Sequence, residues 1–412
     1  MKNLIKKYSS NSNILSLSIL MLAFILPFEK TIIRYYLVIF STTCFFYGDY
    51  KVFLNKKNWL QLSLIILWIF PFIQLLAFQK VELYWSNLLT KLSLLIFPIV
   101  ILIFNGSQEI NLGKIVQFFI HGCTISALFC VVYAFFSFYI FKNENAFKYA
   151  SISVFHHPGY FTMYLNFSIA LLYFNLLKPI KNFLISKKQS LTIIIFLTFF
   201  VLIAASRTGW ITNISIQAFF ISILSINKKI NKKFLIYILL LIIPFSSIIY
   251  FNQTIRNRFQ EVILNSTSSI KNNKIRSSTT VRKKIWETSF KLIKKSWLVG
   301  YGTGIGKKML QEQFKKDGYD YMVKKNFNAH NQFLQVLIDH GLIGFLILSF
   351  YSFFMIYSTI VKKKFIYTIF LSIIILNFLT ESILETQSGV IFFAFFNTIL
   401  FFDWFNFKTL NT

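Results

Sequence analysis

The feature that most constrains this chain is a succession of long apolar runs, broken by one polar stretch at residues 252–330. Hydrophobic residues make up 56% of the sequence and charged residues only 14%, which is more apolar surface than a soluble globule can bury. The runs are continuously apolar, whereas the strands of a membrane barrel alternate. We therefore expect an all-α, polytopic transmembrane bundle of about 12 spans.

The apolar runs predict a single integral-membrane domain over residues 1–412, with 252–330 as a large loop inside it. Each run has about the length that a helix needs to cross the hydrocarbon core. The predicted spans are 14–28, 33–48, 59–78, 88–104, 116–141, 160–177, 191–205, 210–226, 234–251, 333–360, 365–380 and 389–405.

The Lys and Arg residues of the short connections predict the orientation of the bundle. If the N-terminus is cytoplasmic, the inner connections carry 19 basic residues and the outer ones carry seven. The excess predicts that both termini lie in the cytoplasm and that the 252–330 loop lies on the outer, periplasmic face. The outer seven are Lys30, Arg34, Lys80, Lys91, Lys142, Lys148 and Arg207.

The loop is strongly basic, with 17 Lys and Arg residues against five acidic ones, so it suits lipid headgroups or a pyrophosphate-linked substrate. Within residues 281–299, apolar side chains recur at helical spacing and predict a basic amphipathic helix. This helix either lies on the outer leaflet or packs on the bundle. Most of the basic residues outside the loop lie in the predicted inner connections, where membrane topology explains them. We therefore expect membrane lipids and no nucleic acid as partners. The recurring residues are Trp286, Phe290, Ile293 and Trp297.

A glycine-rich segment, 300–307, follows this helix and superficially suggests a nucleotide-binding loop. A phosphate-binding loop needs Gly where Tyr301 stands and Ser or Thr where Lys308 stands, and no strand precedes the segment. Gly302 and Gly304 instead predict a turn that allows close approach of the backbone, either to a ligand or to the bundle.

Three other polar positions fall on the predicted outer face. Arg207 lies between two apolar spans, where its guanidinium suits phosphate oxygens. His157 opens a further span, and Glu381 lies in the last outer turn. Topology alone therefore places Arg207, His157 and Glu381 on one face with the exit of the large loop.

At that exit, His330 precedes Asn331 at the start of the 333–360 span. An imidazole, whose ordinary pKa is about 6.5, can accept a proton from a sugar hydroxyl. His330 is therefore the predicted general base. His340 lies about ten residues deeper in the same predicted helix, roughly 15 Å by helical rise, and neither it nor His121 is expected to be the base.

All three cysteines, Cys44, Cys123 and Cys130, fall in apolar spans. They predict small core residues instead of a disulfide framework or a thiolate metal site. We expect no metal and no cofactor.

Taken in order, these motifs resemble the bacterial O-antigen ligase and O-antigen polymerase superfamily, whose members are lipid-carrier-dependent membrane glycosyltransferases. The resemblance extends over about residues 160–400, and its strength lies in the order of the motifs. The matching segments are Ser206-Arg207-Thr208-Gly209, Arg282 with Trp286, Gly300-Tyr301-Gly302-Thr303-Gly304, His330-Asn331-Gln332-Phe333-Leu334, Asp339-His340-Gly341-Leu342-Ile343-Gly344, His157-Pro158-Gly159-Tyr160 and Glu381.

The resemblance implies an enzyme of the bacterial inner membrane that moves a glycan from undecaprenyl pyrophosphate to an acceptor hydroxyl, such as a sugar of the lipid A core, without a metal. It implies that Arg207 and Arg282 bind the pyrophosphate and that His330 acts as base. Arg276 is an alternative to Arg282. The implied supporting residues are His157, Asn331, Glu381, Gly302 and Gly304.

The motifs leave the acceptor open. The family includes ligases, polymerases that join repeat units onto a growing glycan, and enzymes that glycosylate protein hydroxyls. A transporter of lipid-linked glycans is the alternative from another class, and it predicts charges at mid-membrane depth and matching interrupted helices.

Overall fold

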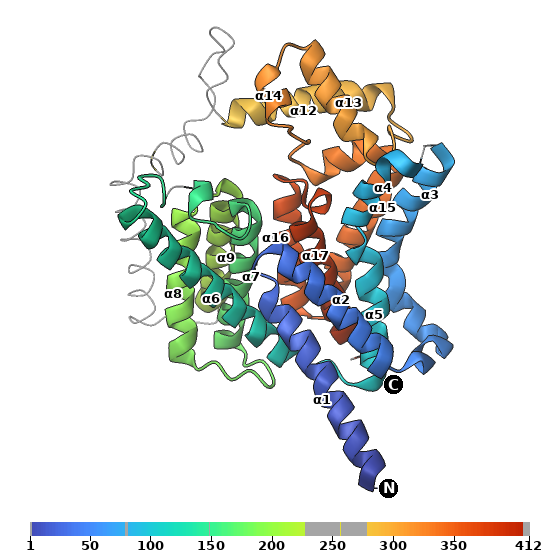
Figure 1. The fold of residues 1–412 in the computed structure, drawn as a ribbon, viewed down its shortest axis with the longest axis vertical. Helices are drawn as coiled ribbons and strands as arrows, with labels where there is room; N and C mark the ends of the chain where they lie inside the picture. Colours follow the sequence, from blue (N-terminus) through green and yellow to red (C-terminus); the bar gives the residue numbers. More distant parts are fainter. Residues whose placement is uncertain (1, 79–80, 148, 227–255, 257–277, 407–412) are drawn as a thin grey trace. The chain divides into compact units, whose positions relative to one another are not determined.

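The computed structural model describes residues 2–78, 81–147, 149–226, 256 and 278–406, and their regular structure is helical throughout (Figure 1). The predicted all-α class is confirmed for these residues. The helices are α1 (Lys2–Ile25), α2 (Lys30–Tyr47), η1 (Tyr50–Leu54), η2 (Lys56–Ile65), α3 (Ile66–Phe78), α4 (Val81–Thr90), α5 (Ser93–Ser107), α6 (Leu112–Tyr139), η3 (Tyr149–Ser151), α7 (Pro158–Leu177), α8 (Lys187–Ile203), α9 (Arg207–Ile226), α12 (Ser278–Lys295), α13 (Ile305–Lys316), α14 (Asp320–Lys324), α15 (Gln332–Val361), α16 (Phe365–Phe378), η4 (Ile383–Glu385) and α17 (Gln387–Asn406).

Among the described residues, six helical segments are long and apolar enough to cross a membrane, which supports a multi-pass membrane protein. Two shorter apolar helices cover 13–25 and 365–378. The predicted span at 234–251 lies outside the described residues, and the number of about 12 spans stays a prediction. The six segments are Asn58–Ala77, Trp85–Ser107, Leu112–Tyr139, Pro158–Leu177, Gln332–Val361 and Gln387–Trp404.

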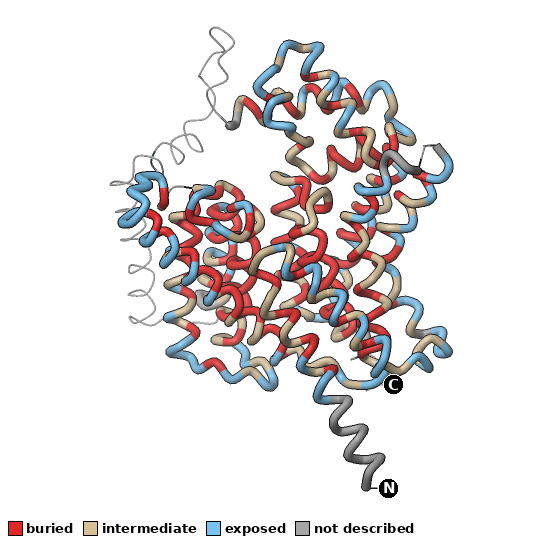
Figure 2. Tube along the Cα trace, viewed as in Figure 1, coloured by how far each residue is buried: buried red, intermediate tan, exposed pale blue. Residues whose placement is uncertain are grey.

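Two of these segments, α7 and α17, are apolar around their whole circumference and are buried along most of their length (Figure 2). A helix with no polar face can be covered either by lipid or by other helices. In α17, for example, Phe395 packs edge-on against Phe97 of α5, with 5.5 Å between the ring centroids. The burial of α7 and α17 shows that other helices cover most of their surface.

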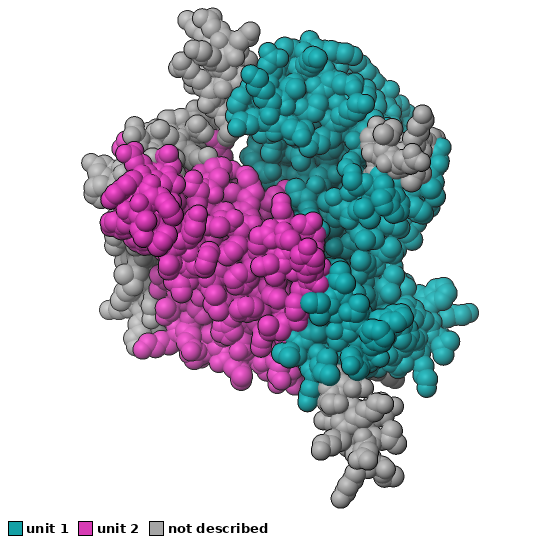
Figure 3. All heavy atoms as spheres, viewed as in Figure 1, with its two compact units in different colours: residues 1–18, 37–110, 269–412 teal, residues 19–36, 111–268 magenta. Residues whose placement is uncertain are grey.

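The chain divides into two compact units (Figure 3). Unit 1 comprises residues 1–18, 37–110 and 269–412, and unit 2 comprises residues 19–36 and 111–268. In unit 2, α7, α8 and α9 pack together, and α9 approaches α7 closely because Gly209 has no side chain: a Cβ there would lie 2.5 Å from the hydroxyl of Thr162. The amide of Asn166 in α7 donates to the Gly209 carbonyl at 2.9 Å.

In unit 1, the helices α12, α13 and α14 form a small cluster on the start of α15 (Figure 1). They share an apolar core that includes Ile285, Leu310 and Phe314. The predicted amphipathic helix is present as α12, and its apolar stripe is divided in two. Trp286 and Ile293 pack on the shared core, whereas Phe290 and Trp297 stay 53% and 57% exposed.

Helix α15, which is long and apolar enough to cross a membrane, is interrupted at Gly341, where φ is 63° and ψ is −161°. A break in a membrane helix leaves carbonyl and N–H groups without their helical partners, and lipid offers them none. The segment 297–302 supplies these partners. The N–H groups of Tyr301 and Gly302 donate to the carbonyls of residues 338 and 339 at 2.9 and 2.7 Å, and the N–H of Leu342 donates to the Trp297 carbonyl at 2.8 Å.

Candidate active site

His330 stands immediately before α15, in a position that the start of this helix fixes. The side chain of Asn331 caps α15 by accepting a hydrogen bond from the N–H of Leu334 at 3.1 Å. The same side chain donates to the carbonyl of Leu379 at 3.1 Å, just beyond α16. Asn331 therefore ties the beginning of α15 to the turn that follows α16.

That turn carries Glu381, whose carboxylate lies between His330 and Arg282. The imidazole Nδ1 of His330 lies 2.9 Å from Oε2 of Glu381, and Nη2 of Arg282 lies 2.7 Å from Oε1. The side chain of His330 is 23% exposed, that of Arg282 26% and that of Glu381 12%, so all three are partly accessible to solvent. Glu381 lies 51 positions from His330 and 99 positions from Arg282 in the chain, yet the three residues form one cluster in unit 1.

The cluster can hold the imidazole in one orientation and one tautomer. With a proton on Nδ1 that is donated to Glu381, Nε2 is the nitrogen that accepts a proton. The carboxylate also stabilises the imidazolium that forms when Nε2 is protonated. The guanidinium of Arg282 offsets the charge of Glu381 and has further N–H donors beyond the one that Glu381 accepts. This geometry suits general base chemistry next to an anion.

The backbone at His330 is strained and is held by its neighbours. Its φ is +45°, a left-handed value that is uncommon for residues other than glycine. The N–H of His330 donates to the Asn328 side chain at 3.0 Å, and the indole N–H of Trp286 donates to the Ala329 carbonyl at 3.2 Å. The Ala329 N–H in turn donates to Gln335 at 3.0 Å. Strain maintained in this way is typical of functional sites.

Gly302 and Gly304, predicted to allow a close approach, belong to the segment that docks on the break in α15. Gly302 donates to the Asp339 carbonyl, and Gly304 precedes α13 with φ 82°. At Gly300, a Cβ would lie 2.5 Å from the Gly341 nitrogen. Of the two predicted partners of this segment, the structure shows the bundle.

The other predicted site residues, Arg207 and His157, belong to unit 2. Arg207 is the first residue of α9, and the preceding Ser206 hydroxyl accepts a hydrogen bond from the Gly209 N–H at 3.2 Å. His157 caps α7: its Nδ1 accepts from the Gly159 N–H at 3.3 Å, and its Nε2 lies 3.1 Å from the Tyr149 hydroxyl. The roles of Arg207 and His157 in substrate binding stay predictions, and Arg276 lies outside the described residues.

Sequence reasoning missed a buried group, Lys91, which it counted only as a basic residue of an outer connection. The Lys91 side chain is 6% exposed, and its ammonium lies 2.7 Å from a carboxylate oxygen of Glu385. A lysine inside an apolar run is the signal that could have found it, since such residues are costly and usually functional.

The cysteines are free and buried, as predicted for small core residues. In the part of the chain that the structure describes, no three His, Cys, Asp or Glu side chains come together as a metal site requires. The candidate site consists of His330, Glu381 and Arg282, in which the carboxylate of Glu381 contacts both other side chains directly.

These features define a multi-pass helical membrane protein with a carboxylate-oriented histidine beside an arginine. Residues 192–349 match the model of the O-antigen ligase family, which confirms the resemblance predicted from the motifs. No curated protein matches the chain. The matched range is under half of the chain; it includes Arg207, Arg282 and His330, whereas His157 and Glu381 lie outside it.

Proposed function

We propose that this protein is an O-antigen ligase that transfers a glycan from undecaprenyl pyrophosphate to a hydroxyl of the lipid A core. The reaction takes place at the outer face of the bacterial inner membrane, with both termini of the chain in the cytoplasm. The observation that carries the proposal is the contact of His330 with Glu381, which orients an imidazole as a base, in a chain whose residues 192–349 match the O-antigen ligase family.

In this reaction, Nε2 of His330 removes the proton from the acceptor hydroxyl as its oxygen attacks the anomeric carbon. The bond from that carbon to the pyrophosphate oxygen breaks, and the electron pair leaves with the pyrophosphate. Attack from the side opposite the leaving group inverts the anomeric configuration. Glu381 stabilises the imidazolium, whose proton passes to solvent after the transfer.

Charge neutralisation is the second task, because the leaving pyrophosphate is an anion. The Arg282 guanidinium, with Glu381 on one of its donors, offers its other N–H groups to the phosphate oxygens. Arg207 is proposed as a second phosphate ligand on the strength of its position in the family motif. Neither step requires a nucleotide sugar or a metal ion.

The proposal is tested by transfer assays with the full-length protein in lipid nanodiscs. Purified undecaprenyl-pyrophosphate glycan is supplied with lipid A core, with a second lipid-linked repeat unit, or with an acceptor peptide. Glycan on the lipid A core supports a ligase. Product only on the repeat unit or the peptide replaces the ligase with a polymerase or a protein glycosyltransferase.

His330→Ala is expected to abolish transfer, and His121→Ala serves as a histidine control from outside the cluster. Movement of the lipid-linked glycan across the bilayer with no covalent transfer would indicate a transporter. Transfer that survives His330→Ala in folded protein would contradict the assignment of His330 as base.

A further inference from the structure

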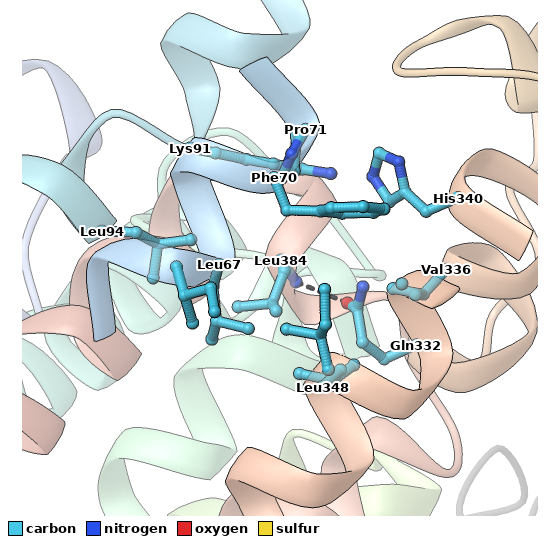
Figure 4. Close-up of a pocket in the computed structure, with 13 residues that line it drawn as sticks. Leu67, Phe70, Pro71, Lys91, Leu94, Gln332, Val336, His340, Leu348 and Leu384 are labelled. Carbon is cyan, nitrogen blue, oxygen red and sulfur yellow. Dashed lines mark hydrogen bonds between the residues drawn. The ribbon is translucent and has the colours of Figure 1, made fainter. Parts of the chain in front are cut away.

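Lys91 lies in the apolar interior of unit 1, between α4 and α5, and the proposed chemistry does not use it. Together with Gln332 and His340, it lines a small cavity of about 30 Å³ (Figure 4). Its partner Glu385 is 18% exposed, and a second carboxylate that faces it, Asp339, is 2% exposed. Removing such charges from water is costly, so a buried ion pair is weak evidence of a stabilising role. The position of the pair calls for another explanation.

Glu385 ends the segment that carries Glu381. This segment, residues 379–385, connects α16 to α17 through the short helix η4. Three consecutive residues at the start of α15 hold it from one side. Asn331 donates to the Leu379 carbonyl, His330 contacts Glu381, and the Gln332 side chain accepts from the Leu384 N–H at 2.7 Å, the bond drawn in Figure 4.

On the side of α5, this segment is contacted by Lys91, whose ammonium forms an ion pair with Glu385. The segment is thus held from the start of α15 at residues 379, 381 and 384, and by Lys91 at Glu385. Within residues 379–385, short-range turn hydrogen bonds include that from the Glu385 N–H to the Ser382 carbonyl at 3.2 Å. Without the ammonium, the Glu385 end loses its counter-charge, and the carboxylate would move toward other polar groups.

We infer that Lys91 is a positioning residue, which holds Glu385 and thereby keeps the carboxylate of Glu381 aimed at His330. The kinetic consequence of this inference rests on the proposed function, whereas the contacts from which it is drawn do not depend on that function. A misplacement of catalytic groups by about 1 Å can lower a rate on the order of 100-fold. Lys91 therefore affects turnover without touching the substrate.

The first test measures kcat and KM for the lipid-linked donor in nanodiscs containing the full-length protein. Lys91→Met is expected to lower kcat by roughly 10- to 100-fold and to leave KM unchanged, because donor binding does not involve Lys91. Lys294→Met, which removes an exposed lysine of α12, is the matched control and is expected to keep the wild-type kcat. An equal loss in the two variants, or a loss confined to KM, would overturn the inference.

A merely structural ion pair is separated from a positioning one by removing both charges. Lys91→Met with Glu385→Gln leaves no buried charge unpaired, so this double variant is expected to fold even where Lys91→Met alone does not. Its kcat is expected to stay low although its thermal stability is close to that of the wild type. A double variant with the wild-type kcat would show that the pair has no positioning role.

A double-mutant cycle tests whether Lys91 acts through Glu381. In a Glu381→Gln background, the further change Lys91→Met is expected to cost nothing more in kcat, because the carboxylate that it positions is already absent. Losses that multiply would overturn the inference.

A structure of the doubly neutral variant separates this inference from the proposed function, since it does not depend on activity. The separation of Nδ1 of His330 and Oε2 of residue 381, which is 2.9 Å in the native protein, is expected to increase. An unchanged separation would overturn the inference even in an active enzyme. An increased separation in the variant, together with a wild-type protein that has no transferase activity, would refute the proposed function and leave the positioning role of Lys91 standing.

Discussion

Replacing Glu381 by Gln tests the central contact of the site while changing its volume very little. In the native cluster, one carboxylate oxygen accepts from Arg282 at 2.7 Å and the other lies 2.9 Å from Nδ1 of His330. An amide has only one oxygen. If that oxygen faces Arg282, the amide NH₂ faces Nδ1, which then has to carry the lone pair, and Nε2 becomes the protonated nitrogen. The imidazole in that tautomer cannot act as the base.

The electrostatic contribution gives the expected size of the effect. A carboxylate about 4 Å from the centre of a forming imidazolium stabilises it by roughly 4 kcal/mol at an effective dielectric constant of about 20. Because both side chains are partly exposed, we expect about 3 to 4 kcal/mol, which corresponds to a roughly 10²- to 10³-fold lower kcat. KM for the donor is expected to change less, since His330 and Glu381 act on the acceptor hydroxyl.

The assay measures initial rates of glycan transfer by the full-length protein in nanodiscs, with thermal unfolding recorded for each variant. Glu287→Gln, which removes a carboxylate paired with Lys284 in α12, is the control and is expected to retain the wild-type rate. A folded Glu381→Gln protein with a kcat near the wild-type value would refute the reasoning that this carboxylate orients and stabilises the base.

Three further predictions concern stability. In a thermal unfolding assay, Gly341→Ala is expected to destabilise unit 1 by about 2 to 4 kcal/mol, because at a φ of 63° the new Cβ would lie 2.3 Å from the Leu298 carbonyl oxygen. The control is Gly318→Ala, where φ is 74° and nothing lies within 4 Å of the new Cβ. This control is expected to cost only about 1 kcal/mol. Burial lowers the pKa of His156 from 6.5 to about 4, so between these pH values the unfolded state is protonated and the folded state is not. The free energy of unfolding should therefore fall by roughly 3 kcal/mol as the pH is lowered from 6.5 to 4. His156→Asn should lose that part of the pH dependence. Asn331→Ala should cost about 1 kcal/mol through loss of the helix cap and should lower kcat as well, whereas Asn331→Asp should retain the cap; equal kcat in the wild type and Asn331→Ala would contradict its role in locating His330.

The membrane-helix class and the family resemblance followed from local sequence. Apolar runs predict helices because a backbone in lipid must satisfy its own hydrogen bonds within the segment. A described helix lies at each predicted span except 234–251, which falls outside the described residues. The ordered motifs around Arg207, Arg282 and His330 predicted the resemblance to the O-antigen ligase superfamily, and the match over residues 192–349 confirmed this resemblance.

The amphipathic helix and the glycine segment were predicted only in part. Helical spacing correctly indicated a helix at α12, but spacing cannot tell which neighbour covers which side chain. Trp286 is partly buried and Trp297 is exposed because α13, α14 and the start of α15 cover only one flank of the stripe. The glycines of 300–304 indicated a close approach, and the break at Gly341 decided what they approach.

The sequence by itself determined that this chain crosses a membrane, that it carries a large basic polar stretch, and that His330 is the foremost candidate for a base. Only the tertiary structure decided that Glu381 lies between His330 and Arg282 and that Lys91 is paired with Glu385. The physical reason is the range of the interactions. Hydropathy and helix capping act over a few neighbouring residues, whereas these ion pairs join groups far apart in the chain and exist only where helix packing brings them within 3 Å.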